Sequence, residues 1–266
     1  MNWMKYRYIY FSVSGILLIT GIFSLFNWGL KLGIDFTGGV VAEYQLPSGE
    51  IKSEKYAVKS DDETNKIREN IKKLNAKELK FEVVGPSIGP ELIRKTLYAL
   101  LISATLILFW VAIQFKSIKF GVSATLATLH DSLILIGSFS LLGHFLNVEI
   151  DFLFVTAVLT ILSFSVHDTI VVYDRIREKQ RKYDPSFGSD ITKIANSALT
   201  ETMVRSLNNS FTIIFMLLAL VLMGGDSIRW FAVALLIGTI SGTYSSPFVA
   251  VPLLITWEEL EKRFKK

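Results

Sequence analysis

Two carboxyl groups interrupt long apolar stretches of this sequence. Asp168 lies inside the run 152–173, and Asp131, preceded by His130, lies inside the run 120–143. An ionised carboxylate at the centre of a membrane-spanning helix costs about 2.5–3.5 kcal/mol on insertion scales, so burial there favours its neutral form. A carboxyl group that changes its protonation near neutral pH can carry protons, and intramembrane carboxylates are typical of proton pathways.

Neighbouring residues could act with Asp168. Ser165 precedes it by three residues and shares its helix face, and His167 precedes it directly. Arg205 opens the next apolar run, from where it could stabilise the ionised carboxylate. Both residues also have a structural alternative. The Asp168 carboxylate could form a hydrogen bond to a neighbouring helix, and Arg205 could simply anchor its helix at the cytoplasmic boundary. The first alternative, a hydrogen bond between helices, applies equally to Asp131 and the histidine before it.

Six apolar runs are long enough to cross a bilayer, whose hydrocarbon core of roughly 30 Å needs about 20 helical residues. They cover residues 8–30, 96–115, 120–143, 152–173, 206–225 and 230–257. Hydrophobic residues make up 51% of the 266, and they are gathered in blocks, which favours a membrane protein over a soluble domain. The first run is too long for a signal peptide and lacks a cleavage site, so we interpret it as an uncleaved span within residues 1–30.

Basic residues gather in alternate loops. They are Lys5 and Arg7 before the first span, Lys116 and Lys119 after the second, Arg175, Arg177, Lys179, Arg181, Lys182, Lys193 and Arg205 in the loop 174–205, and Lys262, Arg263, Lys265 and Lys266 in the tail 258–266. The loop 144–151 has none, and the loop 226–229 has only Arg229. The positive-inside rule therefore predicts that both termini are cytoplasmic. The long loop 31–95 is predicted outside, since long loops translocate largely regardless of charge.

The loop 31–95 has the pattern of a small folded domain outside the cytoplasm. Val40–Leu46 and Leu79–Val84 are rich in strand-forming residues. Between them, Ser60 and Glu63 match a capping box that starts a helix. The prediction is a strand–helix–strand α+β domain, followed by the remaining spans within 96–257. About 60 residues are marginal for independent stability, so attachment to the membrane would help.

Glycine-rich motifs mark both ends of this domain. The sequence GIDFTGG follows the first span, and VGPSIGPEL precedes the second. Glycine adopts positive φ at little cost, and proline suits turns and first helical turns, so we predict tight turns that act as hinges. The residues concerned are Gly33, Asp35, Gly38, Gly39, Gly85, Pro86 and Gly89.

The cytoplasmic segment 174–205 is polar, with turn signals at 184–189. Asp190 can cap a short amphipathic helix whose apolar residues include Ile191, Ile194 and Leu199. We place this helix on the inner membrane surface.

Composition excludes several kinds of chemistry. The chain has no cysteine, which excludes disulfides and thiolate catalysis. Three histidines without an HExxH pattern make a zinc enzyme a poor interpretation. The net charge of +4 reflects the basic cytoplasmic loops rather than binding to nucleic acid. We therefore expect no cofactor, no metal ion, no nucleic-acid partner and no enzymatic activity.

Together these motifs resemble the SecF family, the partner of SecD in the Sec protein-export system. They are GIDFTGG, VGPSIGPEL, LHDSLILIG, FSVHDTIVVYDRIRE, NSALTETMVRSL and SSPFVAVPLL, spread over nearly the whole chain. The run DTIVVYDRIRE is the most specific of them. The resemblance implies an α-helical membrane protein with six transmembrane helices, half of an RND-type (resistance–nodulation–division) bundle, and a small α+β extracytoplasmic domain.

The resemblance also implies partners and roles. The partners would be a SecD-type subunit in a heterodimer, a SecYEG-type channel, the translocating polypeptide and lipid of the cytoplasmic membrane of a prokaryote. Asp168 would be the family's proton-path aspartate and Arg205 its arginine partner. From their position inside the third span, we predict that Asp131 and His130 line the same polar path, with a hydrogen bond between helices as the alternative. His167 stands where the family usually has Asn, which leaves open whether it replaces the amide as a hydrogen-bonding group or titrates itself.

The leading hypothesis is a subunit that uses the proton gradient. Protonation of Asp168 would weaken its pairing with Arg205, shift the helices and, through the glycine hinges, move the outer domain. One charge crossing 100 mV releases about 2.3 kcal/mol, which is similar to typical coupling energies between sites.

Two other classes are weighed against it. A small-molecule exporter built on the same half-bundle would have far larger outer loops. An intramembrane aspartyl protease would use Asp131 and Asp168 as a pair sharing a proton, but the G-x-G-D context of one such family is missing.

The predicted topology can be tested with reporter fusions. Fusions after residues 60, 147 and 227 should report the outside, and fusions after 118, 190 and 266 the cytoplasm, because of the distribution of basic loops. A cytoplasmic signal from the fusion after residue 60 would contradict six spans.

Overall fold

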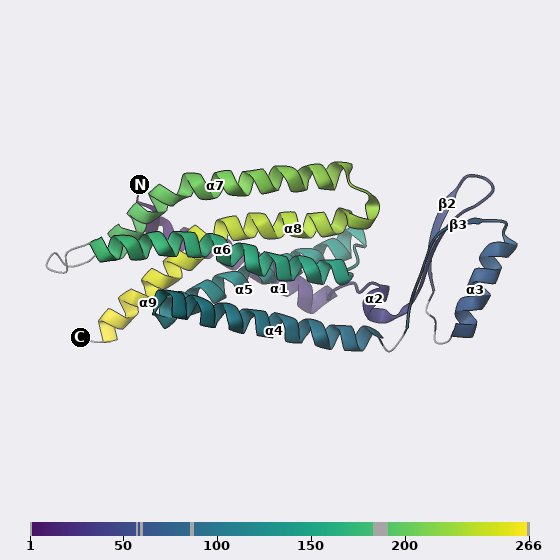
Figure 1. The fold of residues 1–266 in the computed structure, drawn as a ribbon, viewed down its shortest axis with the longest axis horizontal. Helices are drawn as coiled ribbons and strands as arrows, with labels where there is room; N and C mark the ends of the chain where they lie inside the picture. Colours follow the sequence, from purple (N-terminus) through teal and green to yellow (C-terminus); the bar gives the residue numbers. More distant parts are fainter. Residues whose placement is uncertain (1, 57, 59–60, 86–87, 183–190, 265–266) are drawn as a thin grey trace. The chain divides into compact units, whose positions relative to one another are not determined.

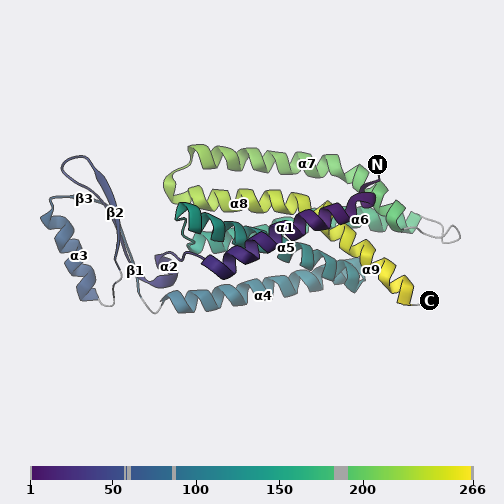
Figure 2. The ribbon, with the colours of Figure 1, turned by 180° about the vertical axis from the view of Figure 1, so that it is seen from behind.

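The chain is divided into two compact units. The computed structural model describes residues 2–56, 58, 61–85, 88–182 and 191–264. The helical unit comprises residues 1–30, 100–148 and 153–266, and the sheet unit comprises residues 31–99 and 149–152. Figures 1 and 2 show the two sides of the chain.

Within the described residues, six helices are long and apolar enough to cross a membrane, as predicted. They are the 3-10 turn Trp3–Tyr6 with α1 (Arg7–Trp28), α4 (Ile88–Phe115), α5 (Ile118–Leu146), α6 (Phe152–Lys182), α7 (Ile191–Met223), and α8 (Asp226–Ser245) continued by a π-helical segment (Ser246–Ala250) and α9 (Val251–Phe264). Several of them extend well beyond the apolar runs of the sequence.

The prediction of a separate surface helix after the fourth span was wrong. α6 continues to Lys182, and α7 starts at Ile191 and runs without a break into the fifth span. The apolar residues Ile194 and Leu199 are buried in the core of the helical unit instead of facing the membrane surface. Packing against other helices buries this face more completely than a membrane surface would. The predicted turns at 184–189 and the cap at Asp190 lie outside the described residues.

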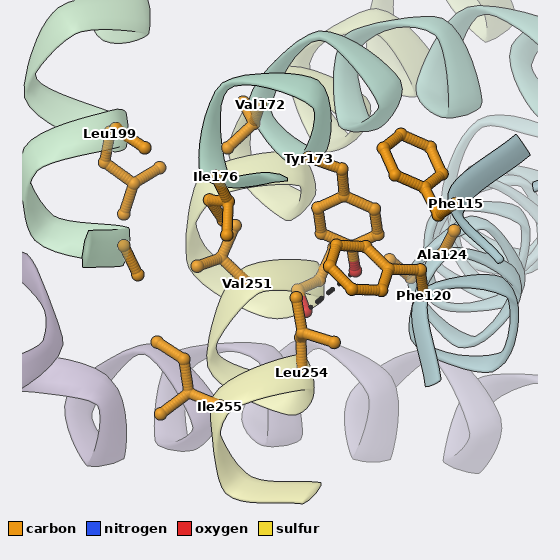
Figure 3. Close-up of a cluster of buried hydrophobic side chains, with 14 of the residues drawn as sticks. Phe115, Phe120, Ala124, Val172, Tyr173, Ile176, Leu199, Val251, Leu254 and Ile255 are labelled. Atoms are coloured by element: carbon orange, nitrogen blue, oxygen red, sulfur yellow. Dashed lines mark hydrogen bonds between the residues drawn. The ribbon is translucent and has the colours of Figure 1, made fainter. Parts of the chain in front are cut away.

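The core of the helical unit is a cluster of aromatic and aliphatic side chains from several helices (Figure 3). Tyr173 of α6 is fully buried in it. Its ring packs edge-on against Phe115 of α4 and Phe120 of α5, with centroid distances of 5.9 and 5.0 Å. Its hydroxyl is 2.7 Å from that of Ser123 and donates to the carbonyl of Ala250 at 3.1 Å. The cluster thus ties α6 to α4, to α5 and to the start of α9.

Glycines let the helices approach closely. A Cβ atom on Gly137 of α5 would lie 2.5 Å from the Cα of Gly21 in α1. Beyond this contact, the hydroxyls of Ser24 and Ser140 are 2.7 Å apart. Small residues at membrane helix interfaces allow such backbone contact, so α1 and α5 form a close pair.

The sheet unit contains a three-stranded antiparallel sheet in the order β2-β1-β3, among the residues described. Its elements are α2 (Ile34–Thr37), β1 (Gly39–Gln45), β2 (Ile51–Tyr56), α3 (Asp61–Lys73) and β3 (Lys77–Val84). Ile71 of α3 packs on Ala42 and Tyr44 of β1.

The predicted strand–helix–strand order is present as β1, α3 and β3. The sequence analysis missed β2, a charged edge strand with mostly exposed residues and therefore no clear apolar alternation. The unit extends to Ala99, within the early turns of α4, instead of ending at residue 95. Ser60 of the predicted capping box lies outside the described residues.

The close pair of α1 and α5 predicts the effect of a single methyl group. Gly137→Ala should destabilise the protein by about 1–3 kcal/mol, since its Cβ would meet backbone atoms that cannot rotate away. Gly15→Ala in α1 is the control, since among the described residues no atom outside its own helix lies within 4 Å of its Cβ position. Thermal unfolding of the purified protein checks the difference, and equal stability of the two variants would contradict the close contact.

Candidate functional site

Asp131 lies at the centre of a polar cluster inside the helical unit. Its side chain has no solvent exposure. Its carboxylate accepts hydrogen bonds from the hydroxyls of Ser165 (2.6 Å), Ser241 (2.6 Å) and Ser245 (2.5 Å). The Nδ1 atom of His130 lies 3.1 Å from it. Buried carboxylates need such donors, and here they come from α6 and α8, so Asp131 ties three helices together.

The local sequence of α8 explains how two hydroxyls reach this carboxylate. Gly238 and Gly242 are four residues apart and face α6: a Cβ on Gly238 would lie 2.3 Å from Ile161, and one on Gly242 would lie 3.4 Å from Ser165. This small-xxx-small spacing allows α8 to approach α6 closely. Ser241 and Ser245 are also four residues apart and therefore share one face of α8, the face that meets Asp131.

A π-helical segment follows this face. Ser246 is its first residue, and its hydroxyl lies 2.9 Å from that of Thr169 in α6. It also donates to the carbonyl of Gly242 at 3.1 Å. Single π-helical turns inside α-helices occur frequently at functional sites. At the start of this segment two consecutive serines meet different helices, Ser245 meeting Asp131 of α5 and Ser246 meeting Thr169 of α6.

Asp168 forms a second buried carboxyl site, between α6 and α7. Its side chain is 5% exposed. The hydroxyl of Ser206 lies 2.6 and 2.5 Å from the two carboxylate oxygens. Asp168 follows Ser165, a donor to Asp131, by three residues, so one turn of α6 joins the two sites. No hydrogen bond joins the two carboxyl groups in the described structure, whereas a protease dyad would share a proton.

The expected pair of Asp168 and Arg205 is not formed. Across the described ranges no ion pair joins the two residues, and Arg205 is exposed while the next residue, Ser206, turns inward to the carboxylate. Neighbouring residues on a helix point about 100° apart, so only one of the two can face Asp168. Arg205 instead lines a cavity of about 490 Å³ together with Asp174 and Thr202.

This cavity has charged walls. Besides Asp174, Thr202 and Arg205, its lining residues are Gln114, Ile170, Val171, Arg175, Glu178 and Glu201. Arg175 pairs with Glu178 of its own helix and with Glu201 of α7, and Lys179 also pairs with Glu201. Thr202 precedes Ser206 by one turn of α7, so a polar face of this helix runs from the cavity towards Asp168.

The two histidines of the prediction lie in different surroundings. His130 is 5% exposed, and its Nε2 atom is buried without a hydrogen-bond partner in the described part of the chain. His167 is exposed. Because His167 faces away from the core while Asp168 faces into it, its ring lies on the outer face of α6.

The outer face of α6 is polar. Between residues 154 and 173, the exposed positions are Thr156, Thr160, Ser163 and His167. Their spacing of four, three and four residues places them along one helix face, here called the α6 polar face. By contrast, α1 exposes Ile19 and Phe26, and α4 exposes Trp110, as expected for contact with lipid.

The glycine motifs belong to the sheet unit. Gly38 and Gly39 have positive φ (71° and 129°), as predicted. A Cβ on Gly89 would lie 2.0 Å from the carbonyl oxygen of Phe36, so this position has no room for a side chain. Gly33 and Asp35 precede these residues, Gly85 follows β3, and Pro86 lies outside the described residues.

Most of the chain matches one family. Residues 63–260 match the family described as protein export membrane protein SecD/SecF, C-terminal, and residues 23–46 match the SecD/SecF GG motif. The chain belongs to the SecD/SecF family. It is therefore a membrane protein of this family, in agreement with the resemblance seen in its motifs.

Relatives with assigned names cover almost all of the chain. The protein translocase subunit SecF of Thermobaculum terrenum is 38% identical over 96% of this chain and 93% of its own length. SecF of Sebaldella termitidis is 34% identical over 99% of this chain and 92% of its own length. The protein translocase subunit SecDF of Bacillus subtilis is 29% identical over 96% of this chain but only 38% of its own length.

Solved structures of the SecD/SecF family have the same fold. A crystal structure of SecDF from Thermus thermophilus, described as a translocon-associated membrane protein, has a TM-score of 0.85 and 30% identity over 97% of this chain. A super-membrane-facing form of SecDF has a TM-score of 0.78 and 30% identity over 100% of the chain. The chain spans only about 40% of these SecDF chains. The half-bundle with a small α+β unit is thus the shared fold.

Sequence reasoning missed the hydroxyl groups. Ser206, Ser241 and Ser245 hold the two carboxylates, but serine is common and carries no signal alone. The available signal was the spacing in α8. Ser241 and Ser245 are four residues apart, as are Gly238 and Gly242, so the two serines share one helix face beside a close helix contact.

The Asp131 cluster predicts a clear stability difference. Ser245→Ala should destabilise the protein by about 1.5–3 kcal/mol, since a buried carboxylate loses a charge-assisted hydrogen bond. Ser138→Ala is the matched control, as this hydroxyl donates within its own helix, to the carbonyl of Ile134. Thermal unfolding measures both. Equal stability would show that the Ser245 hydroxyl does not support the carboxylate.

Proposed function

We propose that the chain is the SecF-type subunit of a SecDF complex, which uses the proton gradient to promote Sec-dependent protein translocation across the cytoplasmic membrane. The names of its relatives support a role in protein translocation. The observation that carries the proton step is Asp168, a carboxyl group in the middle of a membrane-spanning helix that is held by one serine and paired with no cation in the described structure. Such a group can gain and lose a proton at modest cost.

The cavity beside Arg205 provides access for protons in this proposal. Its charged lining connects it to water, and Thr202 and Ser206 continue its polar face towards Asp168. Arg205 and the carboxylates around it lie along the proposed path of the proton. Arg205 does not form a fixed ion pair with Asp168. Protonation of Asp168 removes the charge that Ser206 stabilises, and the contact between α6 and α7 changes with it.

Asp131 and His130 extend the path along α6. Ser165 donates to Asp131 one turn from Asp168, so a change at one carboxyl alters the hydrogen bonds around the other. The unpartnered Nε2 atom of His130 offers a further position for a proton. His167 does not belong to this buried path but to the α6 polar face.

A second helical bundle is the partner proposed for the α6 polar face. Hydroxyl and imidazole groups along a whole membrane-spanning face are unfavourable against lipid and are commonly used between helices. SecDF relatives and structures contain more than twice the length of this chain. A SecD-type subunit therefore covers this face in a heterodimer, with a SecYEG-type channel and the translocating polypeptide as further partners and both termini in the cytoplasm.

Asp168→Asn tests the proton step. It keeps the shape of the side chain but cannot titrate, so it should abolish the stimulation of translocation by the proton gradient and leave insertion and complex assembly intact. Asp226→Asn, an exposed carboxylate of α8 that does not line the cavity beside Arg205, is the control and should keep the stimulation. Reconstituted vesicles with an imposed proton gradient give the measurement. Normal stimulation in Asp168→Asn would refute the proposed role.

Arg205 gives a second comparison in the same assay. Arg205→Lys keeps the positive charge in the cavity and should retain partial stimulation, while Arg205→Leu should reduce it strongly. Equal activity of both variants with the wild type would remove Arg205 from the path.

A further inference from the structure

The GIDFTGG segment, residues 33–39 of the longer match 23–46 and here called the GG motif, is attached to the first residue of α6. The carboxylate of Asp35 accepts a hydrogen bond from the backbone N–H of Phe152, at 2.8 Å. The N–H of Gly33 donates to the carbonyl of Ile150 at 2.8 Å, and the N–H of Ile150 donates to the carbonyl of Lys31 at 2.9 Å. These contacts lie within the sheet unit, which includes residues 149–152.

The backbone fit around these bonds is tight. Leu32 and Ile150 are paired as a parallel β-bridge. A Cβ on Gly33 would lie 2.9 Å from the carbonyl oxygen of Ile150, so glycine is required for this approach. Lys55 of strand β2 forms an ion pair with Glu149. The short segment before α6 is thus held by backbone bonds, by a side-chain cap and by an ion pair.

Asp35 acts as a helix cap supplied from elsewhere in the chain. The first N–H groups of a helix have no partner within it, and a carboxylate there also interacts favourably with the positive end of the helix dipole. Phe152 is the first residue of α6, the helix that carries Asp168. The same motif meets the start of α4, where Gly89 touches the carbonyl of Phe36. β1 begins at Gly39, the last residue of the motif.

We propose that Asp35 is a coupling residue that keeps the start of α6 attached to the sheet unit, so that movement of α6 is passed to β1. The GG motif then works as a fixed clamp, not as the flexible hinge predicted from its glycines. The proposal rests on the proposed proton-driven function, but it concerns the transmission of the movement and not its source at Asp168.

The main experiment compares variants of Asp35 in the full complex. An N-cap contributes a factor of roughly 2–30 to the equilibrium between the attached and detached states, so Asp35→Ala should lower proton-stimulated translocation by about tenfold. It should also increase amide hydrogen exchange at residues 152–155. Asp35→Asn keeps a capping oxygen and should retain both properties, because Asn and Asp cap helices equally well.

Asp226→Ala is the matched control. Asp226 also stands in the first turn of a membrane-spanning helix, α8, where it pairs with the exposed Arg229 of the same helix. Its removal should leave stimulation unchanged and should not alter exchange at residues 152–155.

A disulfide can replace the lost attachment. The chain has no native cysteine, and bridge partners such as Leu32 and Ile150 have the roughly 5 Å Cα separation that a disulfide needs. In the Asp35→Ala background, the additional changes Leu32→Cys and Ile150→Cys should restore stimulation when oxidised and lose it again on reduction. A hinge would give the opposite result, since the crosslink would stop its movement.

The outcomes separate the two proposals. Unchanged stimulation in Asp35→Ala, unchanged exchange at residues 152–155, or loss of activity on crosslinking would each overturn the coupling role, whatever Asp168→Asn does. If Asp168→Asn keeps its stimulation, the proposed proton site fails, and the coupling role is then decided by Asp35→Ala and its rescue alone.

Discussion

The bundle depends on the burial of the Asp131 carboxylate. A buried charge without donors would cost several kcal/mol, and three serine hydroxyls and a histidine meet this one. Two of the donors come from α8, which also lies close to α6 at Gly238 and Gly242. The hydrogen bonds of one side chain therefore fix the relation of α5, α6 and α8.

α6 is the element on which the functional features converge. It donates to Asp131 through Ser165, carries Asp168 one turn further, and packs Tyr173 into the aromatic core. Its exposed face is polar, and its first residue is capped by Asp35 of the sheet unit. A change in protonation at Asp168 thus acts on a helix that already contacts most of the helical unit and begins within the sheet unit. A rigid helix such as α6 can transmit an allosteric change if it has two discrete arrangements.

Much of this could be predicted from the sequence. Apolar runs of sufficient length identified the six spans, and carboxylates inside such runs identified Asp131 and Asp168, since both signals follow from the cost of burying charge in lipid. The partner of Asp168 was predicted wrongly as Arg205. Arg205 and Ser206 are neighbours, and the rotation of α7 about its axis decides which of the two side chains faces Asp168. A polar segment has no apolar periodicity from which this rotation could be predicted. The burial of the start of α7 was missed because it depends on contacts with distant segments. The strand β2 was missed because it is a mostly exposed edge strand, formed by its pairing with β1 and without apolar alternation.

The central claim is that the protonation state of Asp168 sets the contact between α6 and α7. The absence of native cysteine allows spin labels to be placed at Lys182→Cys in α6 and Val204→Cys in α7, both at exposed positions. We expect the distance between the labels to change between neutral and acidic pH in the complex with its SecD-type partner, and to stay constant in the same pair carrying Asp168→Asn. A distance that does not respond to pH, or one that responds equally in Asp168→Asn, would contradict the account.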